Sequence, residues 1–408
     1  MSLKRIEIKN FKSFKELKIN LGKFNTLIGD NASGKSNFIQ IFKFLVDIAN
    51  FGLDNAVSMQ GGIEYLRNIN IGASENFSLK VVSDQKAEFT KQTKKGLIGI
   101  KIYETIYEFA LKFNKGGFKI AKDNFIYKCE FVKLKKEKEK IGQGEIISSR
   151  DKEGKIKISL SKEVPIKKED IYTPFLKEEK LSPTTLLFQR SFFFMPPLYS
   201  ELFSDISIYD FDPNLPKKAI PITGKAELEK DGNNLFIILK NIMKNKEKRR
   251  KLFNLVKDLL PFINNFGVEK FANKSLLFEL QEIYFKNQYL PVSLISDGTI
   301  NIIALIVALY FEKKSLTIIE EPERNIHPYL ISKIVDMMKD VSEKKQIIIT
   351  THNPEIVKYT GLNNILIASR DEEGFSLISR PTDKEEVKIF LQNKIGIEDL
   401  YVQNLLKV

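Results

Sequence analysis

The chain has 408 residues, 43% of them hydrophobic, and carries a formal net charge of +13. This length favours two or three lobes over one core, and no apolar run approaches the roughly 18 residues of a membrane-spanning helix. The start is charged where a signal peptide needs an apolar core, and there is a single cysteine, so we expect a cytoplasmic protein with no disulfide framework and no membrane partner.

Residues 3–49 are expected to form three strands followed by a helix. Apolar and polar residues alternate over residues 3–8, 14–19 and 24–28. Apolar residues at helical spacing follow from residue 37 onwards and predict a helix that ends near Ala49.

The middle of the chain has a different pattern. Between residues 76 and 160, short alternating stretches are broken by glycines and Lys/Glu runs, which predicts an antiparallel sheet with a solvated hairpin tip at residues 133–140. One long helix is expected over residues 235–260, where it carries the basic cluster 244–251, and more strands are expected at 268–285.

The last part of the chain alternates between helix and strand patterns. Helices are expected at residues 299–312, 328–339 and 354–359, and strands at residues 316–319, 346–350 and 365–369. This alternation predicts a parallel sheet with helices on its faces.

The strand at 24–28 and the following helix enclose a sequence that fits G-x-x-x-x-G-K-[ST], the phosphate-binding P-loop. The free amides at the helix start would face the phosphates, with Lys35 reaching the β- and γ-phosphates and the Ser36 hydroxyl holding Mg²⁺. The alternative interpretation is an ordinary glycine-rich turn. The expected nucleotide-binding residues here are Gly29, Asp30, Asn31, Ala32, Ser33, Gly34, Lys35, Ser36 and Asn37.

Two adjacent carboxylates follow the apolar strand at 316–319. Such a pair at the end of a buried strand is costly unless a cation or a water uses it. A Walker B interpretation assigns Glu320 to Mg²⁺ and Glu321 to the attacking water. The alternative is a charged strand end at the surface.

Two further segments fit the same site. Ser296, Asp297 and Gly298 open the helix at 299–312, although alone they would indicate only a helix cap. His352 follows the strand at 346–350 and could contact a γ-phosphate or orient water, or it could be structural.

In this order the motifs resemble an ABC-type ATPase head. The relevant segments are residues 29–36, 296–299, 318–323 and 351–354. The opening at residues 6–14 looks like the start of SMC/RecF-like ATPases, and Glu320 to Glu323 followed by Ile326-His327-Pro328 resembles the stand-alone OLD-like group called "AAA family ATPase". Glu320 departs from the Asp usual in the wider ABC class.

The resemblance implies an α/β fold of the P-loop NTPase class, an ABC-ATPase head. A mixed or parallel core sheet with helices would come from residues 1–75 and 291–408, an antiparallel β lobe from 76–165, and a helical and mixed insert from 166–290. It also implies ATP and Mg²⁺ as cofactors, and ATP sandwiched in a homodimer between the P-loop of one copy and the Ser296 segment of another. Gln189 is the candidate for the Q-loop metal ligand. The alternative is that Gln189 is an ordinary polar residue with no role at the metal.

The function expected from this resemblance is an ATPase switch, with Glu321, His352 and Lys35 as catalytic residues. ATP would close the dimer, and a separate nuclease or toxin effector would read that state in DNA maintenance or repair, or in antiviral (anti-phage) defence. The residues after His352 are too few for a nuclease domain of its own. The alternative is a DNA-binding RecF/SMC-like scaffold with slow ATP turnover, in which lysines contact the phosphate backbone without sequence preference.

Overall fold

The chain divides into two compact units. The first unit contains Met1–Gly22, Asp30–Ile206 and Ala368–Ser379, and the second contains Lys23–Gly29, Ser207–Ile367 and Arg380–Val408. The computed structural model describes residues 2–84, 86–93, 96–134, 138–171, 180–189, 203–218, 220–221, 226–271, 275–285, 288–383, 396–403 and 405.

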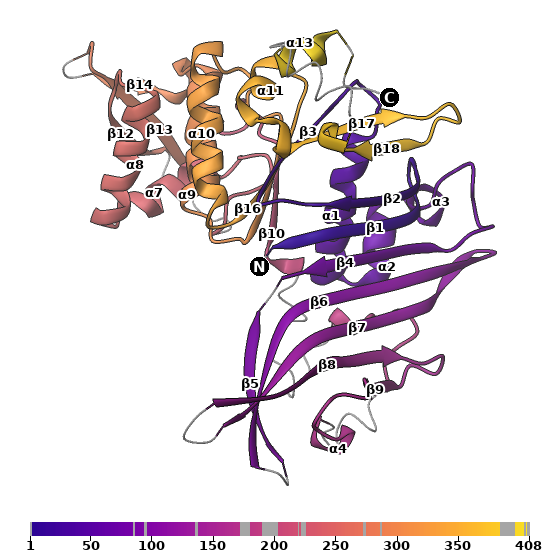
Figure 1. Ribbon diagram of the computed structural model, residues 1–408. Coiled ribbons are helices and arrows are strands. Elements are labelled where there is room, and N and C mark those ends of the chain that lie inside the picture. Colours follow the sequence, from indigo (N-terminus) through magenta and orange to yellow (C-terminus); the bar gives the residue numbers. More distant parts are fainter. Residues whose placement is uncertain are drawn as a thin grey trace. The chain divides into compact units, whose positions relative to one another are not determined.

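An eight-stranded antiparallel sheet forms most of the first unit, with strand order β2-β1-β4-β6-β7-β8-β9 and β5 paired to β6 (Figure 1). This confirms the antiparallel sheet expected after residue 76. Its strands are β1 (Leu3–Phe11), β2 (Phe14–Asn20), β4 (Phe77–Ser83), β5 (Ala87–Thr93), β6 (Gly96–Asn114), β7 (Gly117–Leu134), β8 (Lys138–Arg150) and β9 (Ile156–Leu160).

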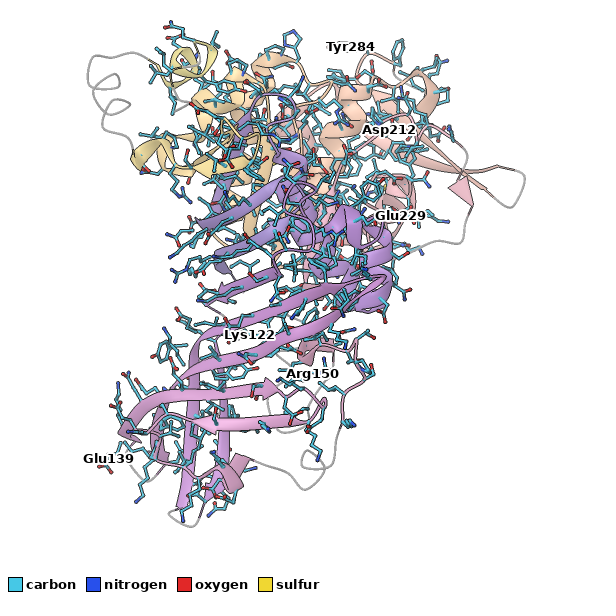
Figure 2. The ribbon with its side chains drawn as sticks, turned by 90° about the vertical axis from the view of Figure 1, so that its right-hand side faces the viewer. Lys122, Glu139, Arg150, Asp212, Glu229 and Tyr284 are labelled. Carbon is cyan, nitrogen blue, oxygen red and sulfur yellow. The ribbon has the colours of Figure 1, made fainter. Side chains whose placement is uncertain are left out.

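Two of these strands are longer than their sequence pattern indicates. Strand β6 has 19 residues and β7 has 18, and the pair is interrupted by bulges at Ile102/Glu104 and Ala110/Leu111. Bulges shift the alternation of side chains, so a continuous strand looks like several short ones in the sequence. Figure 2 labels Lys122 on β7 and Arg150 at the end of β8.

Helices α1 (Lys35–Phe51), α2 (Leu53–Met59), α3 (Ile63–Leu66) and α4 (Lys168–Ile171) belong to the same unit. Phe44 of α1 packs against Phe11 of β1 and Phe77 of β4, with ring centroids 6.3 and 5.8 Å apart. Aromatic burial of this kind anchors the helix on the sheet and so fixes the P-loop at its start.

The second unit contains a sheet with the order β10-β15-β16-β3-β17, whose members are β10 (Ile206–Tyr209), β15 (Leu316–Glu320), β16 (Gln346–Thr351), β3 (Phe24–Gly29) and β17 (Ile365–Arg370). Strands β15, β16 and β3 pair in parallel, as the alternation of helices and strands predicts. From β17 the chain turns into β18 (Ser376–Ser379), which belongs to the first unit.

Helices cover this sheet. They are α9 (Asp297–Tyr310), α10 (Ile331–Ser342), α11 (Pro354–Thr360) and α13 (Ile397–Val402), with a 3₁₀ turn η3 (Pro328–Leu330) before α10. Helix α9 is buried at every residue from Thr299 to Leu309. On the other side, Ile397 and Leu400 of α13 pack with Ile28 of β3 in a smaller apolar cluster.

The helical insert differs from expectation. Two helices, α7 (Leu235–Met243) and α8 (Lys246–Leu259), replace the single helix expected over residues 235–260, so that prediction was wrong. Asn245 is extended between them, and its side chain accepts a hydrogen bond from the Lys248 amide. Asn is among the residues preferred at the N-cap of a helix, because its side chain accepts a hydrogen bond from a free backbone amide. Asn245 therefore separates α7 from α8.

The insert also contains β strands, as expected. They are β11 (Ile220–Pro221), β12 (Ile263–Phe271), β13 (Ser275–Glu282) and β14 (Leu290–Pro291), in a four-stranded sheet. Phe236 of α7 stacks on Phe278 of β13 at 4.2 Å and joins the insert to the main core of this unit. Among the described residues, no helix is long and apolar enough to cross a membrane.

A buried carboxylate holds the segment before Gln189 on the long sheet. Asp123 of β7 is 1% exposed. It accepts hydrogen bonds from the Tyr107 hydroxyl and the Leu187 amide, both at 2.8 Å. Phe188 packs edge-on against Tyr107 at 5.1 Å. Burial raises the pKa of Asp123 to about 7.

This carboxyl should make the stability of the protein depend on pH. Its pKa is about 7 when folded and near its ordinary 3.8 when unfolded, so the folded state holds a proton that the unfolded state loses. The free energy of unfolding should therefore fall as the pH rises from about 4 to 7, by at most about 4 kcal/mol from this group. Denaturant unfolding at a series of pH values measures this slope.

The matched variant is Asp123→Asn, whose amide can still accept from Leu187 and donate to Tyr107 but does not titrate. In Asp123→Asn, the free energy of unfolding should depend less steeply on pH between pH 4 and 7 than in the wild-type chain. An unchanged slope would contradict the assignment of a buried neutral carboxyl to this position.

Candidate functional site

The P-loop has the geometry of an anion cradle. Helix α1 begins at Lys35, directly after Gly34. Ala32 and Gly34 have φ values of +60° and +110°, which turn successive backbone amides inwards. The Lys35 Nζ donates to the Asp30 carbonyl at 2.8 Å, so the amine lies within the curve of the loop. The Ser36 side chain is exposed at the helix start.

A small polar cluster supports this loop from below. Ser376 of β18 is fully buried, and its hydroxyl contacts the Ser33 carbonyl at 2.8 Å and the Ser13 hydroxyl at 2.7 Å. A Cβ at Gly34 would lie 2.2 Å from the Ser376 Oγ, so only glycine fits there. Asn37 completes the cluster by donating to Ser13 at 2.7 Å. Nothing in the sequence points to Ser376, which lies 343 residues after Ser33.

A cavity of about 550 Å³ opens beside the first turn of α1, within the first unit. It is lined by Ser13 and Asn37 of the supporting cluster and by the segment from Tyr65 to Asn70. Arg370, on the rim, donates to the Ala32 carbonyl of the P-loop at 2.9 Å. The cavity therefore borders the P-loop and has room for the nucleoside part of a nucleotide.

The strands of the second unit end level with one another. Glu320 of β15 is paired with Thr350 of β16, and Thr351 is paired with Ile28 of β3. Ile28 directly precedes Gly29, the first P-loop residue. The Walker B carboxylates, the segment with His352 and the entry to the P-loop therefore share one edge of the parallel sheet, where such sheets bind ligands.

Glu321 is held from both sides. Its Oε1 lies 2.7 Å from the His352 Nε2, and its Oε2 lies 3.1 Å from the Arg324 Nη2. Arg324 also donates to Asp210 at 3.1 Å and to the Phe211 carbonyl at 3.2 Å. The structure thus brings together Glu321 and His352, which the sequence analysis selected separately. Arg324 was missed, although its spacing of three residues from Glu321 is a recognisable pattern for an ion pair.

The backbone at Glu321 is strained. Its φ is +43°, in the left-handed region that non-glycine residues seldom adopt. The conformation costs about 1–3 kcal/mol and persists where the surroundings impose it. Here the Glu321 amide donates to the Thr350 carbonyl at 2.9 Å, and the turn closes from the Arg324 amide to the Glu321 carbonyl at 3.0 Å. Such strain commonly occurs at functional sites.

Two carboxylates, Asp210 and Glu321, and two cations, Lys230 and Arg324, act on the half-buried Glu320. Burial, and then the nearby Asp210 carboxylate, raise the pKa of Glu320. A divalent cation would relieve this repulsion, and carboxylate and hydroxyl oxygens are the donors that Mg²⁺ prefers. The Glu320 carboxylate in the second unit therefore suits Mg²⁺ in its chemistry, and the exposed Ser36 hydroxyl in the first unit is also an oxygen donor of the kind that Mg²⁺ prefers.

The segment at Ser296 forms the expected helix start. The Ser296 Oγ accepts from the Thr299 amide at 3.2 Å and caps α9. Lys217 lies 2.5 Å from the Asp297 carboxylate and neutralises it. A Cβ at Gly298 would lie 2.4 Å from the Asn325 carbonyl, so α9 packs directly on the loop that carries Glu321.

Gln189 is a correction to the sequence analysis. Its Oε1 accepts from the Leu186 amide at 2.7 Å, and its Nε2 lies 3.4 Å from the Cβ position at Gly52. Gly52 follows the last turn of α1, whereas Ser36 lies in the first turn, about 25 Å away along the helix. The structure does not bring Gln189 to Ser36, and the metal-ligand assignment was wrong because the Asp123 anchor holds this segment at the far end of α1.

Comparisons with known proteins identify curated relatives of this chain. The Septu protein PtuA of Bacillus mycoides (strain KBAB4) is 27% identical over 143 residues, which is 32% of this chain and only 20% of that protein. The ATP/GTP phosphatase of Helicobacter pylori (strain ATCC 700392 / 26695) is 21% identical over 370 residues, covering 87% of this chain and 86% of that protein.

Among solved structures, the SmcHead bound to the C-winged helix domain of ScpA superimposes with a TM-score of 0.50 at 14% identity, covering 93% of this chain and 98% of that chain. This likeness supports the expected fold, the head of an SMC-like P-loop ATPase. A family model described as "AAA domain, putative AbiEii toxin, Type IV TA system" matches residues 24–139 and 178–358. Since these two segments cover more than half of the sequence, the chain belongs to this AAA-domain family.

Proposed function

We propose that the protein binds and hydrolyses ATP in an ATP-dependent homodimer. The observation that carries this proposal is the alignment of the strand ends, because it puts Glu320, Glu321 and His352 on the same sheet edge as the entry to the P-loop. A phosphate cradle, a carboxylate pair and a polar switch residue are the parts that phosphoryl transfer needs.

The P-loop residues would bind and orient the triphosphate. The amides from Ser33 to Ser36 face it at the positive end of α1, and Lys35 would exchange its bond to the Asp30 carbonyl for bonds to the β- and γ-phosphates. Bound Mg²⁺, held by Ser36 and Glu320, would supply neutralisation of phosphate charge.

Glu321 would orient and polarise the attacking water. Its side chain is 32% exposed, so water can reach it. Both oxygens are already paired, but a carboxylate oxygen accepts more than one hydrogen bond. Arg324 holds the carboxylate in position, and His352, which contacts the same carboxylate, would couple the γ-phosphate to it or donate a hydrogen bond to the phosphate directly.

The homodimer would complete each site. Ser296 is exposed at the N-terminus of α9, and the 14-residue helix directs its positive end outwards. The residues Ser296, Asp297 and Gly298 of one copy would then face the γ-phosphate on the P-loop of the other. ATP would act as a bridge between two copies, and hydrolysis would release them.

We further propose that a separate effector of the nuclease or toxin class reads the closed dimer, in defence or in DNA maintenance. The family description, which names a toxin–antitoxin system, and the similarity to a Septu protein support the choice of defence. This part rests on the analogy with relatives rather than on a site in the chain.

The variant Glu321→Gln tests the ATPase proposal. The amide removes the group that polarises water but leaves the P-loop intact, so turnover should fall by about 100-fold or more, and ATP should be trapped. With ATP and Mg²⁺, light scattering should then show twice the monomer mass of 47.0 kDa.

Glu372→Gln, in an exposed turn, is the matched control and should behave as the wild-type chain. A Glu321→Gln protein that remains monomeric and turns over ATP normally would overturn the proposal.

The second candidate function, DNA binding with slow ATP turnover, is favoured by one feature of the second unit. A cavity of about 600 Å³ is lined by five lysines, and two carboxylates, Glu312 and Asp340, oppose them. The lysines come from α8, from the loop before β15 and from the loop before β16; they are Lys251, Lys313, Lys314, Lys344 and Lys345. The sequence analysis found only the part on α8, because the rest is distant in sequence.

One of these lysines has a structural role. Lys345 donates to the Ala308 carbonyl at 2.8 Å, near the end of α9, and burial lowers its pKa to about 8. The exposed members Lys251, Lys313 and Lys344 are the ones that could contact a phosphate backbone.

Replacing Lys251, Lys313 and Lys344 by glutamate should weaken binding of duplex DNA at low salt by tenfold or more. The slope of log affinity against log salt should become shallower by about 0.9 for each phosphate that the protein no longer neutralises. Fluorescence anisotropy across a salt series measures both quantities.

The control triple variant replaces Lys112, Lys115 and Lys119, which are exposed near the β6–β7 turn, and changes the net charge by the same amount. Equal loss of affinity in both triple variants would mean that only overall charge matters. No binding by the wild-type chain at low salt would remove this candidate function.

A further inference from the structure

Beyond the groups assigned above, a third carboxylate lies at the same sheet edge. Glu323 is in the tight turn after Glu321, and its Oε1 accepts a hydrogen bond from the Thr351 hydroxyl. Thr351 is fully buried at the end of β16, and its hydroxyl also accepts from the Asn353 amide at 2.8 Å. This connection joins the loop after β15 to the loop after β16.

Each of these loops carries one member of the Glu321–His352 pair. Glu321 is two residues before Glu323, and His352 directly follows Thr351. The pair has a spacing of 2.7 Å, which requires both loops to keep their positions. The Glu323–Thr351 bond is a second side-chain link between the same loops and is more deeply buried than the pair itself.

The other oxygen of Glu323 indicates a task beyond packing. Its Oε2 is buried and has no hydrogen-bond partner among the described residues. A buried oxygen without a hydrogen-bond partner destabilises the fold, and an apolar side chain at position 323 would avoid this cost. The carboxylate of Glu323 therefore calls for a functional explanation. Burial raises the pKa of Glu323 to about 7, with Thr351 and Arg324 opposing and Glu321 reinforcing the shift.

A contact from the C-terminal helix reaches the same place. Burial and the nearby Glu323 carboxylate raise the pKa of Tyr401 in α13. A hydrogen bond from the Gly29 backbone lowers the same pKa. Glu323 therefore lies at the end of β16 and close enough to Tyr401 to influence it, while Tyr401 contacts Gly29, the first residue of the P-loop.

We propose that Glu323 is a positioning residue that fixes Glu321 and His352 relative to each other by tying their two loops together through Thr351. It does not touch the nucleotide. The expected effects on kcat rest on the proposed ATPase function. The link between Glu323 and Thr351 can also be tested without ATP.

Two variants that break the link should both lower turnover. Glu323→Ala removes the carboxyl, and Thr351→Val removes the hydroxyl with little change of shape. Each should lower kcat by about 10- to 100-fold through misplacement of Glu321, with ATP affinity changed by less than about threefold. The double variant should be no worse than Thr351→Val alone, because that variant already removes the Glu323 link together with the acceptor of the Asn353 amide.

Glu323→Gln is the conservative variant. Its amide oxygen can still accept from Thr351, so most of kcat should return, and kcat should depend less on pH around 7 than in the wild-type chain. The exposed Glu372→Ala is the control for loss of a glutamate and should change nothing.

A second measurement is independent of turnover. The chain contains only two histidines, so the ring-proton NMR signal of His352 is assigned by its loss in His352→Gln. In Glu323→Ala and Thr351→Val the signal should move away from the wild-type position, whereas in Glu323→Gln it should stay near the wild-type position.

The outcomes separate the two proposals. An unmoved His352 signal in both link-breaking variants, additive losses of kcat, or a loss of ATP affinity with kcat unchanged would each overturn the positioning role. A wild-type chain that hydrolyses no ATP would overturn the proposed function, and the NMR result would still decide whether Glu323 positions His352.

Discussion

Backbone hydrogen bonding between the parallel strands β15, β16 and β3 determines where the polar groups of the second unit lie. Because Glu320 pairs with Thr350 and Thr351 pairs with Ile28, three strands end at one level. A shift of one residue in either pairing would turn the strand-end side chains to the other face. The apolar interiors of the strands, which are buried on both faces, make such a shift costly.

The loops beyond these strand ends are held by polar contacts rather than by packing. Glu321 stays in a left-handed conformation because Thr350, Arg324 and His352 surround it. In the first unit, Ser376 lies so close to residue 34 of the P-loop that only glycine fits there. In both units, therefore, residues far away in sequence maintain a strained or crowded segment, which is typical of sites that must be preorganised for a ligand.

Local patterns were sufficient for much of this architecture. The P-loop, the flanking strand and helix, the antiparallel sheet and the parallel core could all be predicted, since each depends on periodicity or on a short motif. The break at Asn245 was missed because the apolar spacing continues across it. Gln189 was misassigned because its position depends on Asp123 in a distant strand, and the Glu323–Thr351 bond left no sequence signal at all.

The central claim is that each nucleotide site needs two copies of the chain. Its most direct test mixes two variants, Lys35→Ala with a damaged P-loop and Ser296→Arg with a blocked helix start, each of which should be inactive alone. If the sites are shared, mixed dimers contain one intact site, and the equimolar mixture should recover about a quarter of the wild-type ATP turnover. A mixture as inactive as its components, or full turnover by Ser296→Arg alone, would contradict the claim.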